Sequence, residues 1–383
     1  MALIIIITGV FCVYYLCAVL FLRRGLLSVV RAVPRATPAG NHTFSIVIAA
    51  RNEERDLRAC LDSVVRQSLD ASRYEVIVVD DRSTDATVDI ARECADRHAN
   101  LTLVRIAETP AGMVPKKHAI MQGIDRSRHE IIVLTDADCI VPPTWLAAID
   151  RMFDGRTGLV QGITAYHEVV GMGRLFYQMQ ALEFIAHNVV AAAAIGAGLP
   201  LNANANNLSF RKDAYREIGG YGGAGAIVSG DDDMLLQKFH RSGSWEIRFM
   251  TDPQGAVTTR PTPTMSGIFE QRKRWGSVTV HYGVSQIALL AGIFIFYLAI
   301  FAAFAGGFWD VRLFAWCAVL LAVKLAGECL LLLPGLRMSG HSRLRRVLPP
   351  ASLLQLPLTV VAVAAGVFGR FSWKGRRFGR TVR

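Results

Sequence analysis

The chain has 383 residues, of which 52% are hydrophobic and 19% are charged, and its formal net charge is +11. This composition is too apolar for an ordinary soluble enzyme, and it excludes a disordered chain, a collagen and a small disulfide scaffold. The positive charge is compatible with nucleic-acid binding, but equally with a membrane protein that has basic loops, so the positions of the charges must decide. The seven cysteines show no zinc-type spacing, and we interpret them as reduced thiols that pack as small hydrophobic groups.

The first 22 residues are apolar and uncharged, and Arg23 and Arg24 follow them directly. A helix of this length crosses about 30 Å of hydrocarbon. Positive charge after the apolar stretch, rather than before it, is typical of an uncleaved anchor. We therefore expect a transmembrane anchor at residues 1–22. Because basic residues mark the cytoplasmic side, the domain that follows is expected in the cytoplasm, which agrees with reduced cysteines.

Residues 41–283 have the charge density and turn residues of a soluble domain. Four apolar, β-branched runs of strand length predict buried strands: Phe44–Ala50, Tyr74–Val79, Leu101–Ile106 and Glu130–Leu134. Helices are predicted between them, the first capped by Asn52 and the third running from about Lys116 to Ile124. Strands that are apolar along their whole length and joined by helices predict a parallel sheet covered on both faces.

The predicted strands end in polar, mostly acidic segments, and ligands of such sheets bind beyond these carboxyl ends. No glycine-rich phosphate loop follows any of the strands, so a bound nucleotide would need a divalent cation between its phosphates and protein carboxylates. Asp136 and Asp138 follow the fourth strand and supply the hard oxygen ligands that Mg²⁺ or Mn²⁺ prefers. A triplet of this kind is also common on solvated turns that bind nothing.

Three consecutive acidic residues, Asp231, Asp232 and Asp233, open another predicted helix. The helix dipole stabilises carboxylates at this position, which is a purely structural explanation. The alternative is a general base, because a carboxylate held near other acids has a raised pKa and can take a proton from a hydroxyl group.

The segment QRKRW, residues 271–275, lies just before the apolar carboxy-terminal part. It is either a basic interfacial helix with an aromatic anchor, or a phosphate clamp combined with a stacking platform.

Three further apolar segments follow at about residues 284–308, 313–333 and 347–369, and a basic tail occupies residues 370–383. If the last segment spans, the tail lies outside, against the positive-inside rule. Its three prolines disfavour a regular helix, so we expect a re-entrant or interfacial segment that leaves the tail in the cytoplasm. In the middle segment, Lys324 and Glu328 are four residues apart and form either a structural charge pair or a functional site.

In this order, the motifs resemble those of the membrane-bound family-2 glycosyltransferases, which include cellulose and hyaluronan synthases, ceramide glucosyltransferases and bacterial lipid or carotenoid glycosyltransferases. The matching motifs are SIVIAARNEE, EVIVVDDRSTDAT, VPKKHAI, LTDADC, NANNLSFRK, SGDDDMLL and QRKRW. The resemblance implies an α/β domain with the GT-A fold at residues 41–283, flanked by transmembrane helices. It also implies a multi-pass protein of the inner cell membrane with its catalytic domain in the cytoplasm.

The resemblance implies roles for individual residues as well. The implied nucleotide contacts are Arg51, Glu53, Asp80, Asp81, Lys116 and Lys117. The implied metal ligands are Asp136 and Asp138, with Asp138 the more direct ligand of Mg²⁺ or Mn²⁺. Asn207 matches a position near the donor sugar. The implied QxxRW motif consists of Gln271, Arg274 and Trp275, in which the arginine faces the diphosphate and the tryptophan faces the acceptor.

The catalytic acidic pair of the family falls on Asp231 and Asp232, which makes Asp232 the candidate base. Aspartate replaces the commoner glutamate at Asp231, and Asp233 follows, so the choice of carboxylate stays open.

The implied reaction is an inverting, metal-dependent transfer of a sugar from a nucleotide sugar, with UDP as the expected nucleotide, to a membrane-lipid hydroxyl. Three apolar segments after the domain are few for a polymer-secreting synthase, which favours a single transfer to a lipid. A processive polysaccharide synthase that extends a growing glycan is the second hypothesis, and a non-catalytic membrane scaffold is the third. Nucleic-acid binding is disfavoured because the basic residues flank membrane segments and the strand ends are acidic.

Overall fold

The computed structural model describes residues 2–32, 40–222, 230–278, 281–368, 371–373 and 376–378. The chain divides into two compact units. The helical unit consists of Met1–Arg31, Gly171–Leu201 and Thr262–Arg383, and the sheet unit consists of Ala32–Val170 and Asn202–Pro261. The range 41–283, expected as one catalytic domain, therefore contains segments of both units, and as a functional domain it stays a prediction.

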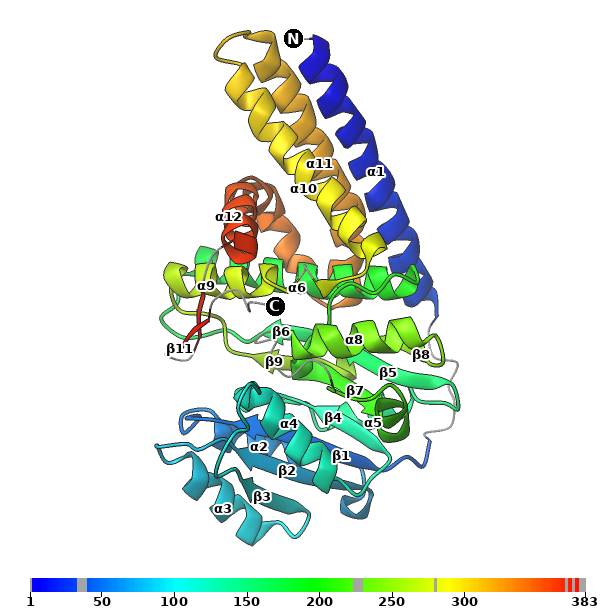
Figure 1. The fold of residues 1–383 in the computed structure, drawn as a ribbon, viewed down its shortest axis with the longest axis vertical. Coiled ribbons are helices and arrows are strands. Elements are labelled where there is room, and N and C mark those ends of the chain that lie inside the picture. Colours follow the sequence, from blue (N-terminus) through cyan, green and yellow to red (C-terminus); the bar gives the residue numbers. More distant parts are fainter. Residues whose placement is uncertain are drawn as a thin grey trace. The chain divides into compact units, whose positions relative to one another are not determined.

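The sheet unit is built on a seven-stranded sheet with the order β3-β2-β1-β4-β7-β5-β8 (Figure 1). These strands are β1 (Phe44–Ala50), β2 (Tyr74–Asp80), β3 (Leu101–Arg105), β4 (Ile131–Leu134), β5 (Thr157–Gly162), β7 (Leu208–Arg211) and β8 (Glu246–Met250). A second sheet pairs β6 (Thr164–Tyr166) with β9 (Val257–Thr259). The four strands predicted from the sequence are confirmed, with ends that differ by one residue at most.

The large sheet is mixed rather than wholly parallel. Strands β1 to β4 pair in parallel, as expected, but β7 runs antiparallel to both β4 and β5. The chain reaches β7 after Gly171–Leu201, which belongs to the helical unit, and not through a helix packed on the sheet. The parallel direction that a β-α-β crossover imposes therefore does not apply to this strand.

Alternating side chains of the strands supply two hydrophobic cores, one on each face of the sheet. Phe44, Ile46 and Ile48 of β1 pack with α2 (Leu57–Val64), α3 (Thr87–Arg97) and α5 (Trp145–Asp150). Val47 points to the other core, which is shared with α4 (Pro115–Arg126), α7 (Lys212–Glu217) and α8 (Asp231–Ser242). Period-two alternation of apolar residues on a strand buried on both sides requires this arrangement.

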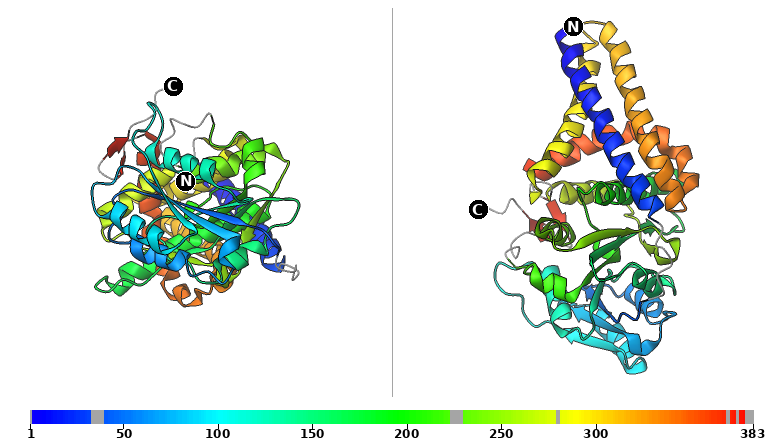
Figure 2. Two further views of the ribbon diagram at one scale, coloured as in Figure 1. Left: turned by 90° about the horizontal axis from the view of Figure 1, so that it is seen from below. Right: turned by 90° about the vertical axis from the view of Figure 1, so that its right-hand side faces the viewer.

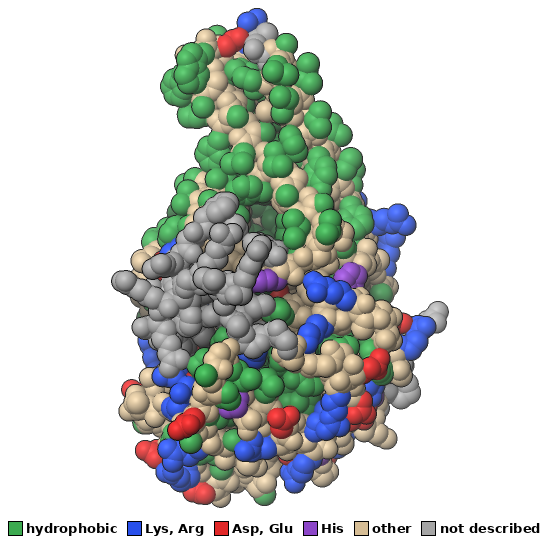
Figure 3. Space-filling view, viewed as in Figure 1, with side chains coloured by type: hydrophobic (Ala, Val, Ile, Leu, Met, Phe, Trp, Pro, Cys, Tyr) green, Lys and Arg blue, Asp and Glu red, His purple; other side chains and the backbone are tan. Residues whose placement is uncertain are grey.

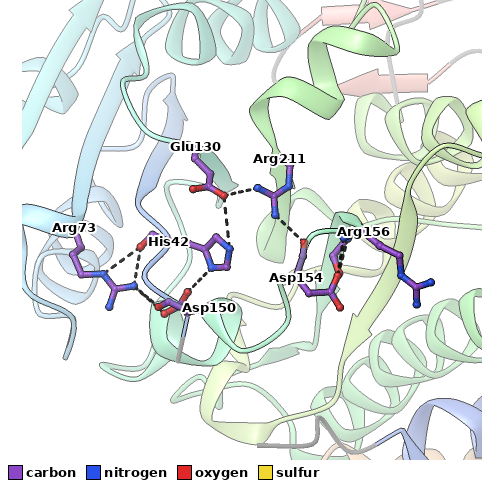
Figure 4. Close-up of polar contacts among 9 residues, drawn as sticks. His42, Arg73, Glu130, Asp150, Asp154, Arg156 and Arg211 are labelled. Atoms are coloured by element: carbon purple, nitrogen blue, oxygen red, sulfur yellow. Dashed lines mark hydrogen bonds and ion pairs between the residues drawn. The ribbon is translucent and has the colours of Figure 1, made fainter. Parts of the chain in front are cut away.

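An ion-pair network holds the end of the sheet where β1 and β4 begin (Figure 4). The buried carboxylate of Asp150 in α5 contacts His42 Nδ1 at 2.8 Å and accepts a hydrogen bond from Arg73 Nη2 at 2.9 Å. Glu130, just before β4, pairs with Arg211 of β7 and lies 3.7 Å from His42 Nε2. The network thus joins four strands to α5 at the end opposite the carboxyl ends of β1, β2 and β4.

The helical unit contains α1 (Ala2–Arg31), α6 (Arg174–Gly196), α9 (Met265–Gly276), α10 (Val284–Gly306), α11 (Arg312–Met338) and α12 (Leu348–Phe368), with a short hairpin of β10 (Phe371–Trp373) and β11 (Arg376–Phe378). Within the described residues, five helical stretches are long and apolar enough to cross a membrane: Ala2–Arg31, Arg174–Gly196, Val284–Gly306, Arg312–Met338 and Ser342–Gly366. Hydrophobic side chains cover the visible face of the long helices (Figure 3). The helix α6 was not predicted from the sequence.

The helices α1, α10 and α11 run alongside one another, whereas α6, α9 and α12 lie crosswise to them, as Figure 1 and Figure 2 show. Pro357 lies inside α12, which continues as one helix. The prolines therefore do not prevent a regular helix here, contrary to the expectation from local propensity. The crosswise course of α12 agrees with an interfacial segment, and the side of the membrane on which the tail lies stays a prediction.

Two contacts fix helices of this unit to one another. The backbones of α1 and α6 meet at Gly25 and Gly196: a Cβ atom added at Gly196 would lie 2.2 Å from the carbonyl oxygen of Gly25. Ser28 Oγ donates a hydrogen bond to the Gly196 carbonyl at 3.0 Å. Between α11 and α12, the buried Lys324 donates to the carbonyl and hydroxyl oxygens of Ser352 at 2.9 and 3.0 Å, and it also pairs with Glu328.

Candidate active site

The loops that follow β1 and β2 are locked together at the carboxyl end of the sheet. Asn52 does not cap a helix as expected, because α2 begins only at Leu57; instead, Asn52 adopts a left-handed φ of 53°. Its side-chain oxygen accepts a hydrogen bond from the Thr84 amide at 2.9 Å, and its own amide donates to Ser83 Oγ at 3.0 Å. Arg82 in the facing loop also has a positive φ of 55°. Such backbone strain typically clusters at functional sites.

These loops bring together Arg51 and the acidic pair Asp80 and Asp81. Both aspartates are buried. The Asp81 carboxylate accepts a hydrogen bond from Arg51 Nη1 at 3.1 Å and two from Arg82, at 2.9 and 2.7 Å. The Asp80 carboxylate accepts one from the Ser83 amide at 3.2 Å. The result is a cluster of buried carboxylates held by the partly exposed guanidinium groups of Arg51 and Arg82.

The two adjacent lysines of α4 have different surroundings. Lys116 Nζ lies 2.6 Å from Asp136 Oδ1, and both side chains are partly exposed. Lys117 is completely buried. Of the two lysines proposed to contact a nucleotide, the structure therefore joins Lys116 to the acidic pair after β4.

Asp138 lies in a strongly acidic environment. Burial raises the pKa of its carboxyl group, and the negative charges of Asp136 and Glu53 raise the pKa further, against the smaller effects of Lys116 and a hydrogen bond from Thr259. An environment that raises the pKa of a carboxyl group in this way disfavours further negative charge and favours the binding of a cation.

The donor set fits a divalent cation that is shared with a substrate. Within the described part of the chain, no group of three or more His, Cys, Asp or Glu side chains is placed to hold a metal ion. Mg²⁺, however, usually takes only one or two protein carboxylates and completes its shell with phosphate oxygens and water. Asp136 and Asp138 supply such a pair, at the end of β4 where a ligand of this sheet is expected.

The acidic run at the start of α8 is tied to the segment that precedes β7. Asp232 Oδ2 accepts a hydrogen bond from the Ala205 amide at 3.0 Å, and Asp233 Oδ1 accepts one from the Ala203 amide at 2.6 Å. The backbone of Asp231 opens the helix, but its side chain lies outside the described residues. Two of the three carboxylates therefore also have a structural role.

Asn207 is buried and its side chain is engaged within the protein. Its Oδ1 accepts a hydrogen bond from Trp145 Nε1 at 2.9 Å, and its Nδ2 donates to the carbonyl oxygens of Ile163 and Gly255, both at 2.9 Å. Both amide hydrogens are thus used. The contact of Asn207 with a donor sugar stays a prediction, and this geometry favours a role in holding the strand ends.

The QxxRW residues belong to α9 in the helical unit. Gln271 Oε1 accepts a hydrogen bond from Arg272 Nη1 at 2.7 Å, and the guanidinium carbon of Arg272 lies 4.2 Å from the centre of the Trp275 ring. Arg274 is half-buried. The other candidate residues belong to the sheet unit.

Some neighbours of the candidate residues were not predicted. Arg82 follows Asp80 and Asp81 directly, so its position beside two acids was an available indication. Thr259 in β9 and Cys139 Sγ, 3.7 Å from Asp138 Oδ1, approach the Asp138 carboxylate. Thr259 is more than a hundred residues from Asp138 in the chain, and no local pattern indicates it.

Comparisons with known proteins agree with the fold. The description "Glycosyl transferase family 2" matches residues 45–191, and "Glycosyl transferase family group 2" matches residues 131–331, more than half of the chain. A mannosyltransferase from Pyrobaculum calidifontis, solved in complex with GDP-Man and Mn²⁺, has a TM-score of 0.55. The comparison covers 91% of this chain and 99% of that one at 19% identity, so it concerns the fold alone.

Relatives in sequence are also glycosyltransferases. The glycosyltransferase AglE of Haloferax volcanii is 26% identical over 57% of this chain and 67% of its own length. A beta-monoglucosyldiacylglycerol synthase of Nostoc sp. is 27% identical over 60% of this chain, which covers 47% of the synthase. The fold is therefore the expected GT-A fold, and the chain belongs to glycosyltransferase family 2.

Proposed function

We propose that the enzyme transfers a sugar from a nucleotide sugar, with UDP as the expected nucleotide, to the hydroxyl group of a membrane lipid at the cytoplasmic face. The reaction is metal-dependent and inverts the anomeric configuration. The observation that carries the proposal is the pair Asp136 and Asp138 at the end of β4, with Lys116 on Asp136. The solved mannosyltransferase with GDP-Man and Mn²⁺ supports a nucleotide sugar and a divalent cation.

Asp136 and Asp138 would hold the cation, which supplies Lewis acidity that neutralises the charge of the departing diphosphate. Arg51, Glu53, Asp80 and Asp81 bind the nucleoside part. Lys116 places a positive charge beside the acidic pair and assists in binding the phosphates. Arg274 of the QxxRW motif is proposed to contact the diphosphate, and Trp275 the acceptor.

Asp232 is the proposed base. Its carboxylate takes the proton of the acceptor hydroxyl while that oxygen forms a bond to the anomeric carbon from the face opposite the leaving group. The bond between the anomeric carbon and the diphosphate oxygen breaks, and the nucleoside diphosphate leaves with the electron pair. A positioned base of this kind contributes typically about 100- to 10,000-fold to the rate. The Ala205 amide holds Asp232 Oδ2, which orients the carboxylate.

A lipid acceptor is supported by the helical unit. Its long apolar helices could cross a membrane, which would bring an enzyme of this family to lipid substrates. The Nostoc relative named as a monoglucosyldiacylglycerol synthase points to the same class of acceptor.

The experiment is to incubate membranes that contain the full chain with radiolabelled nucleotide sugars. We expect one organic-extractable glycolipid of inverted anomeric configuration, and we expect its formation to stop in excess chelator and to return with added Mg²⁺ or Mn²⁺. Labelled polymer that stays at the chromatographic origin would support the processive synthase instead. Transfer that persists in excess chelator would contradict the role of Asp136 and Asp138 as metal ligands.

A further inference from the structure

The side chains packed around the QxxRW tryptophan, Trp275, include residues outside the motifs of the family resemblance. These side chains come from α6 and α9, which lie side by side within the helical unit (Figure 1). Glu183, Phe184 and His187 are on α6, and Arg272 is on α9. Glu183 and His187 are four residues apart, so they lie on one face of their helix.

Glu183 and Arg272 form a two-point ion pair between these helices. Arg272 Nε donates to Glu183 Oε1 at 2.5 Å, and Arg272 Nη2 donates to Glu183 Oε2 at 2.6 Å. The side chain of Arg272 is only 7% exposed and that of Glu183 only 14%. A paired fork of this geometry fixes the plane of the guanidinium as well as its position.

The fixed guanidinium lies over the indole of Trp275, with 4.2 Å between the guanidinium carbon and the ring centre. The His187 ring meets the indole edge-on, with 4.7 Å between centroids and an interplanar angle of 68°. Phe184 lies nearly parallel to it at 6.4 Å. Arg272 also donates a hydrogen bond to Gln271 Oε1, so one side chain contacts both the first and the last residue of the motif.

We propose that Glu183 and Arg272 are positioning residues that hold Trp275 in the orientation needed to bind the acceptor. This inference rests on the proposed function, in which Trp275 contacts the acceptor. A buried ion pair gains little stability over well-packed apolar residues of the same volume, because both charges lose their hydration. Stability alone therefore does not explain why a buried ion pair occupies this position. The two-point geometry of the pair is, however, what is needed to fix the plane of a ring that binds the acceptor.

The first test compares Glu183→Gln and Arg272→Lys with a matched control. Glu183→Gln keeps the side-chain volume and removes the charge, and Arg272→Lys keeps the charge but removes the fork and the planar stacking on the indole. Asp310→Asn is the control, because Asp310, in the turn between α10 and α11, also accepts two side-chain hydrogen bonds from an arginine, Arg312, the first residue of α11.

We expect both test variants to lower kcat/KM for the acceptor by about 100-fold, the size of effect that a small misplacement of a substrate-positioning group produces. The KM for the nucleotide sugar should not change, and Asp310→Asn should behave like the wild type. An equal loss of kcat/KM for the donor and for the acceptor would overturn the proposal. A loss of acceptor kcat/KM no larger than that of Asp310→Asn would overturn it as well. Failure of both variants to fold, judged by nucleotide binding and gel filtration in detergent, would also overturn it.

The second test is a double-mutant cycle with Trp275→Leu. If Glu183 acts through the indole, Glu183→Gln should cause almost no further loss of acceptor kcat/KM once the indole is removed. Losses that multiply independently would show that the pair acts elsewhere. The outcomes are separable from the proposed function: a wild-type enzyme that transfers no sugar to lipid contradicts the proposed function, whereas an active wild type with independent losses contradicts only the positioning role.

Discussion

At the scale of single residues, neighbouring side chains of one type have different surroundings. Lys116 forms an ion pair with Asp136, whereas the adjacent Lys117 is buried. Asp232 and Asp233 accept hydrogen bonds from different amides of one loop. Such pairs share their local sequence, so only the fold distinguishes them. They also offer matched variants, in which the same chemical change is made at adjacent positions.

The base is tested by comparing Asp232→Asn with Asp233→Asn. We expect Asp232→Asn to reduce turnover by at least about 100-fold, because the amide cannot accept the proton, while nucleotide binding stays nearly intact. Asp233→Asn keeps an acceptor for the Ala203 amide and should retain most of the activity. Turnover and nucleotide affinity are measured on the same membrane preparations. Near-normal transfer by Asp232→Asn would exclude it as the base, and a large loss in Asp231→Asn instead would assign the role to Asp231.

The sequence predicted where the acidic pairs lie, while their roles in binding stay predictions; carboxylates that follow parallel strands must gather at one edge of the sheet. Arg51, Asp80, Asp81, Lys116 and the pair after β4 do so. The contacts of Asn207 were beyond prediction, since its three partners, Trp145, Ile163 and Gly255, are distant in the chain. Whether a buried amide is free for a ligand depends on such partners.

At the scale of elements, the two ends of the sheet are built differently. The carboxyl ends of β1 and β2 carry strained loops and the candidate nucleotide contacts, whereas the opposite end is closed by the ion-pair network around Asp150 and Glu130. Because the ion-pair network stabilises one end of the sheet, the loops at the other end can adopt the conformations that ligand binding requires.

The network is tested by Asp150→Asn, which removes the buried charge shared by His42 and Arg73. Breaking a buried ion pair by removing one partner typically costs about 3 to 5 kcal/mol, so we expect a marked decrease in thermal stability of the full chain in detergent. Asp89→Asn, which removes an exposed pair with Arg92, is the control and should change the stability little. Equal unfolding temperatures for the two variants would contradict the structural role of the network.

The strands of the first half were predictable because they are continuous apolar runs of short length. The direction of β7 was not, since it depends on the path of the chain through α6. That helix was itself missed, although a stretch without Asp, Glu, Lys or Arg begins within it and runs from Phe184 to Phe210, which was an available indication. The prolines of α12 led to the opposite error, because packing retained a helix that local propensity disfavours.

At the scale of the whole molecule, the distribution of charge over the chain follows the two units. The helical unit exposes apolar side chains along its long helices, and the sheet unit carries many charged side chains at its surface (Figure 3). Among them, Asp154 accepts hydrogen bonds from the Arg156 amide, from Thr157 and from Arg248. Burial raises the pKa of Asp154, but these hydrogen bonds and the charge of Arg248 outweigh it and lower the pKa to about 2.

This depressed pKa predicts a loss of stability in acid. The ordinary pKa of the group is 3.8, so the native carboxylate contributes stability above about pH 4, and that contribution is lost as the pH falls towards 2. Thermal unfolding of the full chain in detergent between pH 5 and pH 2 measures it. Asp154→Asn should show a shallower decrease over this window, whereas an unchanged pH dependence in the variant would contradict the assignment.

The glycine crossing of α1 and α6 has a consequence for any attempt to shorten the chain. A tether can be exchanged for any hydrophobic helix of equal length, but the backbone of α1 meets that of α6 at Gly25 and Gly196, where no side chain fits. A chain that lacks the first helix would expose the small residues of α6 to water. The first helix is therefore a structural part of the helical unit and not an interchangeable tether.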